Sequence, residues 1–412
     1  MNHSQRKVLI LASTYPRWSD DHEPGFVHEL ARRLTAQFKV RILCPHAPNA
    51  AGRETLDGVE VLRYRYAPSR FETLVNDGGI VNNLKRRPCK WLLVPFFLLG
   101  LLAYTWYEIR RWRPDVIHAH WLLPQGLIVA LLSLVDSSTP PFLVTSHGAD
   151  LFALRARPLT GLKRFVARRA AAMTVVSRIM KDELERIDIA MSKVSVQPMG
   201  VDLMQRFIPA SNIPRSRDEI LFVGRLVEKK GLRYLLAAMP EIIARRPSAF
   251  LTVVGFGPEE SERRAQAEAL GINHKVNFLG ALSQAELPAL YRRAAVFVAP
   301  FVQARSGDQD GLGLVLVEAL GCGCPVVVTD LPASRDVVSD LVAAIRVPAG
   351  QLNKLGEAVV QVLERGDYYD LEAIKAIPQL RKQFDWAQVA SGYALRLAAI
   401  SASDEVKDEV LS

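Results

Sequence analysis

Short hydrophobic runs recur along the first half of the chain at the spacing of strands that alternate with helices. The expected strands are Lys7–Ser13, Lys39–Cys44, Val59–Tyr64, Asp115–His120, Phe142–His147, Met173–Ser177 and Val194–Gln197. Such alternation predicts a parallel sheet with helices on both faces, because helices connect successive parallel strands. The first half therefore predicts a Rossmann-like α/β domain.

The series restarts after the polar stretch around Pro209–Arg217. The expected strands are Glu219–Val223, Phe250–Val254, Lys275–Leu279, Val296–Ala299, Pro325–Thr329 and Ala343–Val347. A chain of 412 residues is too long for one ordinary core, so the repeat predicts two Rossmann-like domains. Ligands of such sheets bind beyond the carboxyl ends of the strands, which predicts a site in a cleft between two facing parallel sheets.

The composition is that of a globular protein, with 49% hydrophobic and 23% charged residues. A net charge of +9 indicates an anionic partner, which could be nucleic acid, anionic lipid or a phosphorylated small molecule. The excess is local, since residues 61–113 hold ten Lys/Arg against three Asp/Glu and residues 153–186 hold nine against three. We therefore expect the cationic surface on the first domain.

The most apolar stretch, Trp91–Tyr107, is framed by cations. Lys85, Arg86, Arg87 and Lys90 precede it, and Arg110, Arg111 and Arg113 follow it. As a helix it would be about 25 Å long, shorter than a hydrocarbon core of roughly 30 Å, so we do not expect it to span a membrane. Two interpretations stay open: a buried helix pair, or an apolar face at an anionic membrane surface, which the flanking cations favour.

Cysteine usage and the start of the chain bear on the compartment. Four cysteines, Cys44, Cys89, Cys322 and Cys324, indicate a reducing compartment without a disulfide framework. The Cys322-Gly323-Cys324 pair has no second pair or nearby histidine to complete a metal site. Because Met1 to Lys7 is polar and leads directly into a strand, we expect no signal peptide and a cytoplasmic protein.

Two cations follow the first strand of the second domain. Arg225 lies at the strand's carboxyl end and Lys230 near the start of the next helix, where the helix dipole already favours phosphate. The pair is typical of a diphosphate clamp, and solvated surface charge is the alternative. Two neighbouring strand ends, at Gly255 and Leu279, could offer backbone groups to a nucleotide.

The segment "GDQDGLGLVLVE", residues 307–318, holds three carboxylates and three glycines. With a helix expected over Leu312–Gly321, Asp310 and Glu318 would lie about 12 Å apart, roughly the span from sugar to ribose in one nucleotide-sugar. The amides of Gly311, Leu312 and Gly313 would then face a phosphate. A metal held by Asp308 and Asp310 is the alternative, which the nearby cations would make redundant.

Histidines end two strands of the first domain. His118 and His120 point to one side of a strand at metal-ligand spacing, but no third ligand is evident, so we expect ordinary hydrogen-bonded histidines. His147, beside a glycine at a strand end, is the better candidate for contacting substrate. Gly25, in the loop that opens the first helix, is the expected backbone donor from this domain.

In their order, these stretches resemble the retaining GT-B glycosyltransferases of the glycogen synthase and phosphatidylinositol mannosyltransferase type (family 4-like, group 1), especially bacterial exopolysaccharide and lipopolysaccharide members. The resemblance covers nearly the whole chain and includes "IHAHW", "TSHGAD", "PMGVD", "FVGRLVEKKGL", "GFGPE", "GDQDGLGLVLVEALGCGCPVV" and "FDWAQVASGYALRL". It implies an acceptor-binding domain at 1–206, a donor-binding domain at 207–384, and a helix at 385–400 that packs back on the first domain.

By this resemblance, Arg225 and Lys230 neutralise the donor diphosphate and Glu318 holds the ribose hydroxyls. Asp310 matches the first position of the family's Glu-x7-Glu, which faces the donor sugar, and His147 matches the histidine near the transferred sugar. The aspartate at 310 departs from the family's glutamate by one methylene, which leaves the identity of the donor sugar open.

The resemblance also implies a reaction: front-face transfer of a sugar, with retention and without a metal or other cofactor. The acceptor would be a hydroxyl of a lipid-linked or polysaccharide precursor, at the inner face of the cell membrane, in cell-surface polysaccharide synthesis. Two alternatives stay open, a nucleotide-sugar epimerase of the same fold and a non-catalytic, membrane-associated nucleotide-sugar-binding protein. We expect no nucleic-acid partner, because Glu318 and the phosphate clamp belong to a site rather than a surface.

Overall fold

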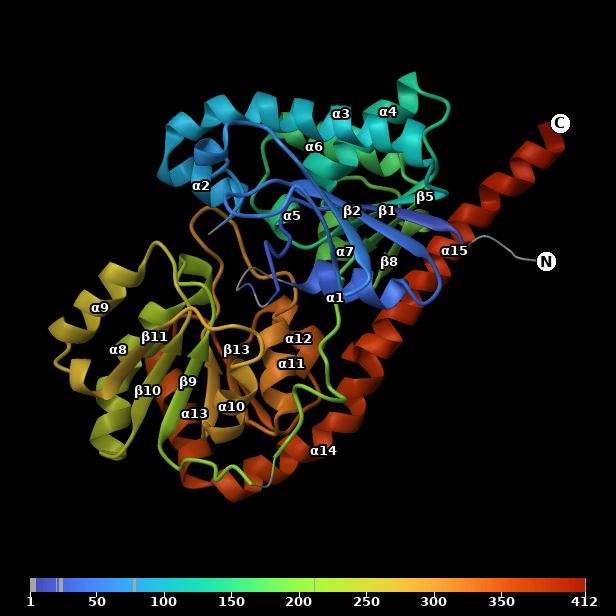
Figure 1. Cartoon of the computed structure of the whole chain (residues 1–412). Coiled ribbons are helices and arrows are strands. Elements are labelled where there is room, and N and C mark those ends of the chain that lie inside the picture. Colours follow the sequence, from blue (N-terminus) through green and yellow to red (C-terminus); the bar gives the residue numbers. More distant parts are fainter. Residues whose placement is uncertain (1–4, 20, 22–24, 77–78, 211, 412) are drawn as a thin grey trace. The chain divides into compact units, whose positions relative to one another are not determined.

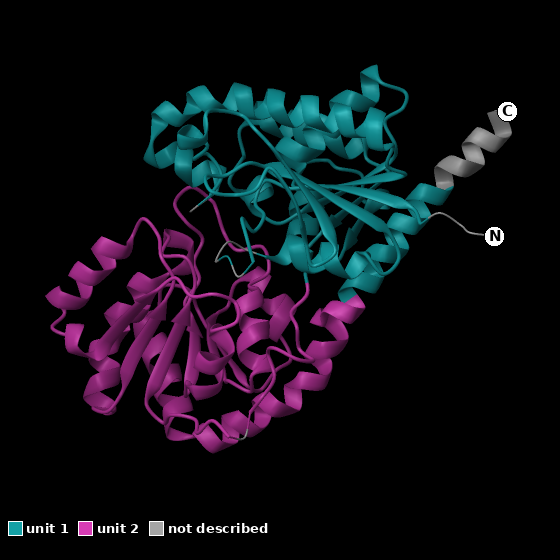
Figure 2. Cartoon of the chain, viewed as in Figure 1, with its two compact units in different colours: residues 1–199, 389–412 teal, residues 200–388 magenta. Residues whose placement is uncertain are grey.

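The computed structural model describes residues 5–19, 21, 25–76, 79–210 and 212–411. Contacts divide the chain into two units, residues 1–199 with 389–412 and residues 200–388 (Figure 2). Each unit is built around its own sheet, which confirms the α/β class expected from the repeated strand series.

The first unit contains an eight-stranded sheet in the order β3-β4-β2-β1-β5-β6-β7-β8 (Figure 1). Its strands are β1 (Lys7–Leu11), β2 (Lys39–Pro45), β3 (Arg53–Leu56), β4 (Val59–Tyr64), β5 (Val116–His120), β6 (Phe142–Ser146), β7 (Ala172–Val175) and β8 (Val194–Val196). Every neighbouring pair is parallel except β3 with β4. Strand β3 at this edge was not predicted from the sequence, because it is a short, polar, partly exposed strand without an apolar run.

Helices cover both faces of this sheet. They are α1 (Phe26–Leu34), α2 (Ile80–Arg86), α3 (Val94–Trp112), α4 (Leu127–Val135), α5 (Ala149–Phe152), α6 (Arg157–Arg169) and α7 (Arg178–Arg186), with short turns η1 (Ser69–Phe71), η2 (Pro88–Leu93), η3 (Leu122–Gly126) and η4 (Met191–Lys193). Helices α3, α4 and α6 form one outer layer (Figure 1).

The last helix, α15 (Trp386–Leu411), belongs to both units of the chain. In the first unit, the ring of Tyr393 stacks on His118 of β5 and its hydroxyl donates to the carbonyl of Gln197 over 3.0 Å. In the second unit, Trp386 packs against Gly200, where a Cβ would meet the indole at 2.5 Å. Specific packing therefore fixes Tyr393 of α15 in the first unit and Trp386 of α15 in the second unit.

The second unit contains a six-stranded sheet in the order β11-β10-β9-β12-β13-β14, and all its pairs are parallel. The strands are β9 (Glu219–Val223), β10 (Phe250–Val254), β11 (Val276–Gly280), β12 (Val296–Ala299), β13 (Val326–Thr329) and β14 (Ala344–Val347). The helices are η5 (Glu228–Lys230), α8 (Leu232–Arg245), α9 (Glu260–Ala269), η6 (Asn273–Lys275), α10 (Leu287–Arg293), α11 (Leu314–Gly321), α12 (Pro332–Val338), α13 (Leu352–Glu364) and α14 (Gly366–Phe384).

Alternate strand residues form the main core of this unit. Ile220 and Phe222 of β9 and Leu251 and Val253 of β10 are buried against apolar side chains of α8 and α13. Because side chains alternate along a strand, Glu219 and Thr252 face the opposite side of the sheet. That opposite face carries the polar groups considered below.

Two sequence-predicted boundaries are wrong by one or two residues at functional positions. Helix α11 begins at Leu314, two residues later than predicted, because Gly313 has a φ of 81°, outside the right-handed helical region. Strand β6 ends at Ser146, so His147 lies in the loop that follows. Both changes place predicted site residues on loops beyond the sheets.

Candidate functional site

The predicted site residues follow the carboxyl ends of strands in each unit. Arg225 comes after β9, Gly255 after β10 and Asp310 after β12, while His147 comes after β6. The carboxyl ends of parallel strands share one edge of a sheet, which is where α/β proteins bind ligands. Each unit therefore presents one cluster of side chains.

In the second unit, lysines and aspartates from two loops pair with one another. Lys230 Nζ donates to Asp310 Oδ2 over 2.5 Å, and Lys229 Nζ lies 3.2 Å from the Asp308 carboxylate and 3.9 Å from Asp310 Oδ1. The Lys230 ammonium also lies 4.5 Å from the centre of the Phe301 ring, a cation–π contact. Lys229, the residue before Lys230, was not among the site residues predicted from the sequence.

Asp310 keeps its negative charge although it is buried. Burial alone would raise the pKa of its carboxyl, but the charges of Lys230 and Lys229, the hydrogen bond from Lys230 and the charge of Arg225 outweigh burial and lower that pKa. The structure thus places Arg225, Lys230 and Asp310 in one electrostatic cluster.

Glycines hold the two loops of this cluster against each other. Gly231 has a φ of 70°, and a Cβ on it would lie 1.8 Å from the carbonyl oxygen of Pro300, so only glycine allows the loop after β9 to touch the loop after β12. Gly255 is similar, because a Cβ there would lie 2.0 Å from the carbonyl oxygen of Gly224. The fold itself therefore requires Gly255, and its contact with a nucleotide stays a prediction.

Glu318 lies inside α11, and its pKa is raised, whereas that of Asp310 is lowered. Tyr291 of α10 donates its hydroxyl hydrogen to Glu318 Oε2 over 3.0 Å. Burial raises the pKa of Glu318 to about 7, although hydrogen bonds from Tyr291 and Gln284 and the charge of Lys230 act in the other direction. Nothing in the sequence pointed to Tyr291, which lies 27 residues before Glu318.

The helical spacing of about 12 Å expected between Asp310 and Glu318 rested on a helix that began near Asp310. Since α11 begins at Leu314, Asp310 lies on the preceding loop, and helical geometry no longer supports that estimate. Lys230 acts electrostatically on both carboxylates instead. Gly311, Leu312 and Gly313 form the connection into α11, where free amides favour an anion.

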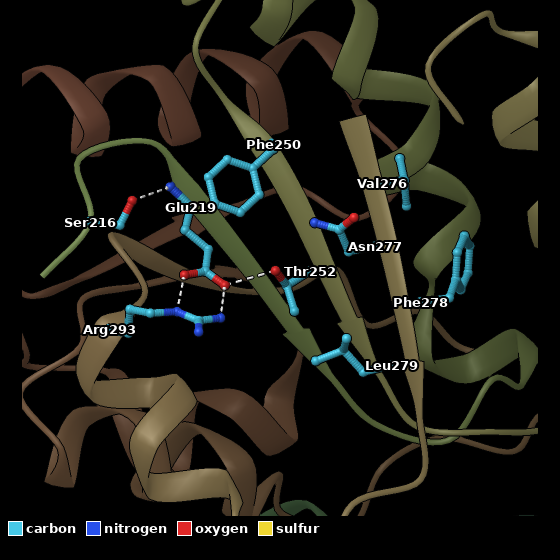
Figure 3. A pocket seen from close by; sticks show the side chains of 9 residues that line it. All are labelled: Ser216, Glu219, Phe250, Thr252, Val276, Asn277, Phe278, Leu279 and Arg293. Atoms are coloured by element: carbon cyan, nitrogen blue, oxygen red, sulfur yellow. Dashed lines mark hydrogen bonds and ion pairs between the residues drawn. The ribbon is translucent and has the colours of Figure 1, made fainter. Parts of the chain in front are cut away.

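Leu279 lines a different hollow, on the face of the second sheet that bears Glu219 (Figure 3). In its lining, Arg293 forms two hydrogen bonds with the buried Glu219 carboxylate, at 2.6 and 2.7 Å, and Thr252 donates to Glu219 over 2.7 Å. Arg225, Lys230, Asp310 and Glu318 do not line this hollow. The donor contact of Leu279 stays a prediction.

In the first unit, His147 joins a cluster of aromatic and imidazole rings. Its ring stacks on His120 with 5.1 Å between centroids, and His120 Nδ1 and His147 Nε2 share a hydrogen bond of 2.8 Å. Phe26 and Trp121 lie 4.8 and 5.1 Å from His147 by ring centroids. Because Phe26 directly follows Gly25 in the chain, the predicted site residues Gly25 and His147 belong to the same cluster.

These histidines are neutral at physiological pH. Burial lowers the pKa of His147 to about 3, with help from His118, and lowers the pKa of His118 to about 3. His118 Nε2 and Thr145 Oγ1 share a hydrogen bond of 2.7 Å, as expected for an ordinary hydrogen-bonded histidine. In the described part of the chain, no group of three or more His, Cys, Asp or Glu residues could hold a metal ion.

The loop that carries His147 is held by Asp150. Its carboxylate accepts hydrogen bonds from the hydroxyl of Ser146 over 2.8 Å and from the backbone amide of Leu122 over 2.7 Å. Asp150 is buried, and burial raises the pKa of its carboxyl. The last residue of "TSHGAD" thus joins the ends of β5 and β6, and His147 is positioned between them.

Two family models match the chain in succession. Residues 26–205 match the model described as Glycosyltransferase Family 4, and residues 204–387 match the model described as Glycosyl transferases group 1. Together they cover the second sheet and every strand of the first sheet except β1. The order of the two matches is that of the two halves expected from the strand series.

Whole proteins are similar over most of the chain. The glycogen synthase of Mycobacterium tuberculosis is 28% identical over 408 residues, covering 94% of this chain and 93% of that protein. The phosphatidyl-myo-inositol mannosyltransferase of Mycobacterium leprae is 30% identical over 294 residues, covering 69% and 74%. The solved structure of Anabaena Alr3699/HepE in complex with UDP-glucose has a TM-score of 0.70 at 16% identity, covering 95% and 99%, which shows a shared fold.

Proposed function

The chain belongs to the family 4-like, group 1 glycosyltransferases of GT-B fold, and from this premise we propose that it transfers a sugar with retention to a lipid-linked or polysaccharide-precursor hydroxyl. It is a transferase that uses a nucleotide-sugar donor. The observation that supports the proposed sugar transfer is the Lys230–Asp310 pair. The charge of Arg225 acts on the same carboxylate, and the buried Glu318 follows in the next helix.

The donor's parts correspond to separate groups of the second unit. Arg225 and Lys230 supply positive charge to the diphosphate, and the amides of Gly311 to Gly313 add the partial charge of a helix start. Asp310, held as a carboxylate, accepts hydrogen bonds from sugar hydroxyls. Glu318, a hydrogen-bond acceptor from Tyr291 in the free protein, accepts them from the ribose.

The proposed mechanism needs no nucleophile from the protein. The bond between the anomeric carbon and the diphosphate oxygen breaks, and its electron pair stays on that oxygen. The acceptor hydroxyl attacks the same face of the oxocarbenium-like centre, and its proton passes to the departing diphosphate oxygen. Lys230 and Arg225 stabilise the charge that develops on the leaving group, the kind of electrostatic stabilisation that supplies much of an enzyme's rate enhancement.

His147 serves the transferred sugar from the first unit. Its pKa of about 3 keeps the imidazole neutral, so it acts as a hydrogen-bond partner and not as a general acid at neutral pH. Gly25 offers a backbone amide beside it. A Cβ on Gly25 would meet nothing within 4 Å, which leaves open space next to this backbone for a ligand.

We propose that the reaction requires no metal. The lysine pairing supports this, because each carboxylate of Asp308-Gln309-Asp310 already faces an ammonium group. The test is activity in EDTA. Full activity supports the proposal, and activity restored only by a divalent cation would refute it.

UDP-glucose, the ligand of the Anabaena structure, is the first donor to test. A thermal-shift screen against UDP-, GDP- and ADP-sugars identifies the donor, since at equal concentration the ligand that binds more tightly stabilises the folded state more. With that donor, Asp310→Ala and Glu318→Ala should each abolish most transfer to acceptors in a membrane lipid extract. Unchanged transfer by both variants would remove these residues from the site.

We place the enzyme in the cytoplasm, at the inner face of the cell membrane, in cell-surface polysaccharide synthesis of the exopolysaccharide or lipopolysaccharide kind. The cationic first half and the lipid named in the mannosyltransferase relative support this. The transfer assay with that donor, run with and without acceptor, separates the alternatives. An epimerase would convert the donor without an acceptor, and a non-catalytic binding protein would bind the donor without transferring its sugar.

A further inference from the structure

An apolar surface lies exposed on α3 and the turn before it. Exposed residues recur in steps of three and four along this helix, at Leu92, Phe96, Leu99, Ala103 and Trp106. Leu92 is 76% exposed and Trp106 48%. Because such steps return to one side of a helix, these residues form a continuous stripe.

Helix α4 extends the stripe sideways. Leu131, Leu134 and Val135 are exposed there, Val135 by 83%. Arg110 Nε of α3 donates to Asp136 Oδ2 over 2.8 Å, so the carboxyl ends of the two helices lie together in the outer layer of the first unit (Figure 1). We call the stripe and these three residues the apolar face.

Exposed cations border the apolar face at both ends. Lys85, Arg86 and Arg87 precede it, and Arg111 and Arg113 follow it. On α6, Arg169 donates to the carbonyl oxygen of Ser133 in α4 over 2.7 Å, next to the exposed Arg168. Residues 80–113 contain a single acidic residue, Glu108, which is buried and paired with Arg41.

The other side of α3 is part of the protein core. Its buried residues are Phe97, Leu101, Thr105, Glu108, Ile109 and Trp112. By length and composition Pro88–Trp112 could cross a membrane, and 28% of its most apolar window is buried. However, Glu108 of this helix is buried and is fixed to β2 through Arg41. A helix anchored along a sheet lies parallel to a surface that it meets, as interfacial helices do.

We infer that the apolar face is a docking surface for an anionic lipid bilayer. Its leucines and aromatic rings enter the headgroup region, where tryptophan is favoured, and the bordering lysines and arginines contact lipid phosphates. The inference deepens the proposed function, since it identifies the surface that brings the enzyme to a lipid-linked acceptor. Docking itself needs neither donor nor transfer.

Vesicle sedimentation with the full chain tests this. The protein should sediment with vesicles of equal parts phosphatidylcholine and phosphatidylglycerol, and far less with phosphatidylcholine alone. The double variant Leu99→Glu, Trp106→Glu should lower partitioning at least about tenfold, because charges at the interface oppose insertion. The matched control is Leu395→Glu on α15 of the same unit, which is 70% exposed and should change nothing.

The cations are tested separately from the apolar residues. Each of Arg86→Gln, Arg87→Gln and Arg111→Gln should lower binding to the anionic vesicles about fivefold, and salt should have the same effect. Brominated lipids should quench tryptophan fluorescence in the unaltered protein, and Trp106→Phe should reduce that quenching. Thermal unfolding of each variant establishes that the fold is intact.

Several outcomes would overturn the inference. One is absence of binding to the anionic vesicles. Another is equal binding by the double glutamate variant. A third is self-association at increasing protein concentration, lost in that variant and without vesicle binding, which would assign the apolar face to a second copy of the chain. Intact vesicle binding without sugar transfer would count against the proposed function and leave this inference standing.

Discussion

The two units treat buried titratable groups in contrasting ways. In the cluster of rings around His147 in the first unit, burial lowers the pKa of His118 and His147 to about 3, so these imidazole rings are neutral. In the second unit, burial raises the pKa of Glu318 to about 7, whereas Asp310 stays ionised. Desolvation opposes charge in both units, and at Asp310 the charges of Lys230 and Lys229 outweigh it.

The largest effect is expected from removing Lys230. Lys230→Ala leaves Asp310 buried without its nearest cation and takes one positive charge from the diphosphate. We expect kcat/KM for sugar transfer to fall about a thousandfold, or about 4 kcal/mol, with weakened binding of the nucleoside diphosphate. Calorimetric titration with the nucleoside diphosphate of the donor that the screen identifies, and a nucleotide-release assay, measure the two effects.

The neighbouring lysine provides the control for this experiment. Lys229→Ala removes the same charge from the same turn but keeps the Lys230–Asp310 hydrogen bond, so its loss should stay within about tenfold. Equal losses in both variants would show that only total charge matters and would remove Asp310 from the argument.

The second effect concerns how the free energy of unfolding depends on pH. Folded Glu318 keeps a proton up to pH of about 7, whereas the unfolded side chain releases it near its ordinary value of 4.5. Its stabilising contribution is therefore present at pH 4.5 and is lost as the pH rises to about 7, amounting to about 3 kcal/mol. Glu318→Gln should remove this decline in urea unfolding measured across that range.

The buried histidines have the opposite sign, which makes the contrast testable within one protein. Their folded pKa values lie below the ordinary 6.5, so their contribution is lost as the pH falls from 6.5 towards about 3. Glu318→Gln should leave this acid-side loss unchanged. If Glu318→Gln flattened both limbs, the two units would not titrate independently.

The third effect separates the roles of the units in catalysis. His147→Ala should lower kcat/KM about a hundredfold, because a hydrogen bond to the transferred sugar is lost. Binding of the donor's nucleoside diphosphate without the sugar should change less than about twofold, since the proposed diphosphate contacts come from the second unit. A large loss of that affinity in this variant would contradict that division.

The smallest effect is expected at a residue that acts through His147. His120→Asn removes the ring that stacks on His147 and shares its Nε2 hydrogen bond, so kcat should fall about tenfold with KM nearly unchanged. His118→Asn is the matched control, because His118 bonds to Thr145 and not to His147. Equal effects of both substitutions would indicate a loss of packing rather than of positioning.

Much of the fold was predictable because hydrophobic runs mark strands directly. Four of the thirteen expected strands, Val59–Tyr64, Glu219–Val223, Phe250–Val254 and Val296–Ala299, have the observed bounds. Strand β3 was missed because an exposed edge strand pairs through its backbone and needs no apolar side chains. Helix α11 was predicted to begin too early because a run of apolar residues does not reveal that Gly313 adopts a positive φ.

The candidate site was predictable as a set of residues but not as a set of contacts. Lys230 and Asp310 were assigned separately, to diphosphate and sugar, and their ion pair joins residues 80 positions apart. It exists because Gly231 lets one loop approach the carbonyl of Pro300, a feature of backbone geometry with no signal in hydrophobic pattern. The contacts Tyr291–Glu318 and His120–His147 depend in the same way on how neighbouring strands and helices pack.

The first unit is formed by two stretches of chain that are far apart in the sequence, and this has a consequence for protein synthesis. Residues 1–199 leave the ribosome long before residue 389, where the remaining part of that unit begins. At about 5–20 residues per second, the intervening segment takes on the order of 10–40 s to make. During that time the sheet lacks Tyr393, the ring that stacks on His118 from α15, so this face of the nascent chain is open to chaperones and to aggregation.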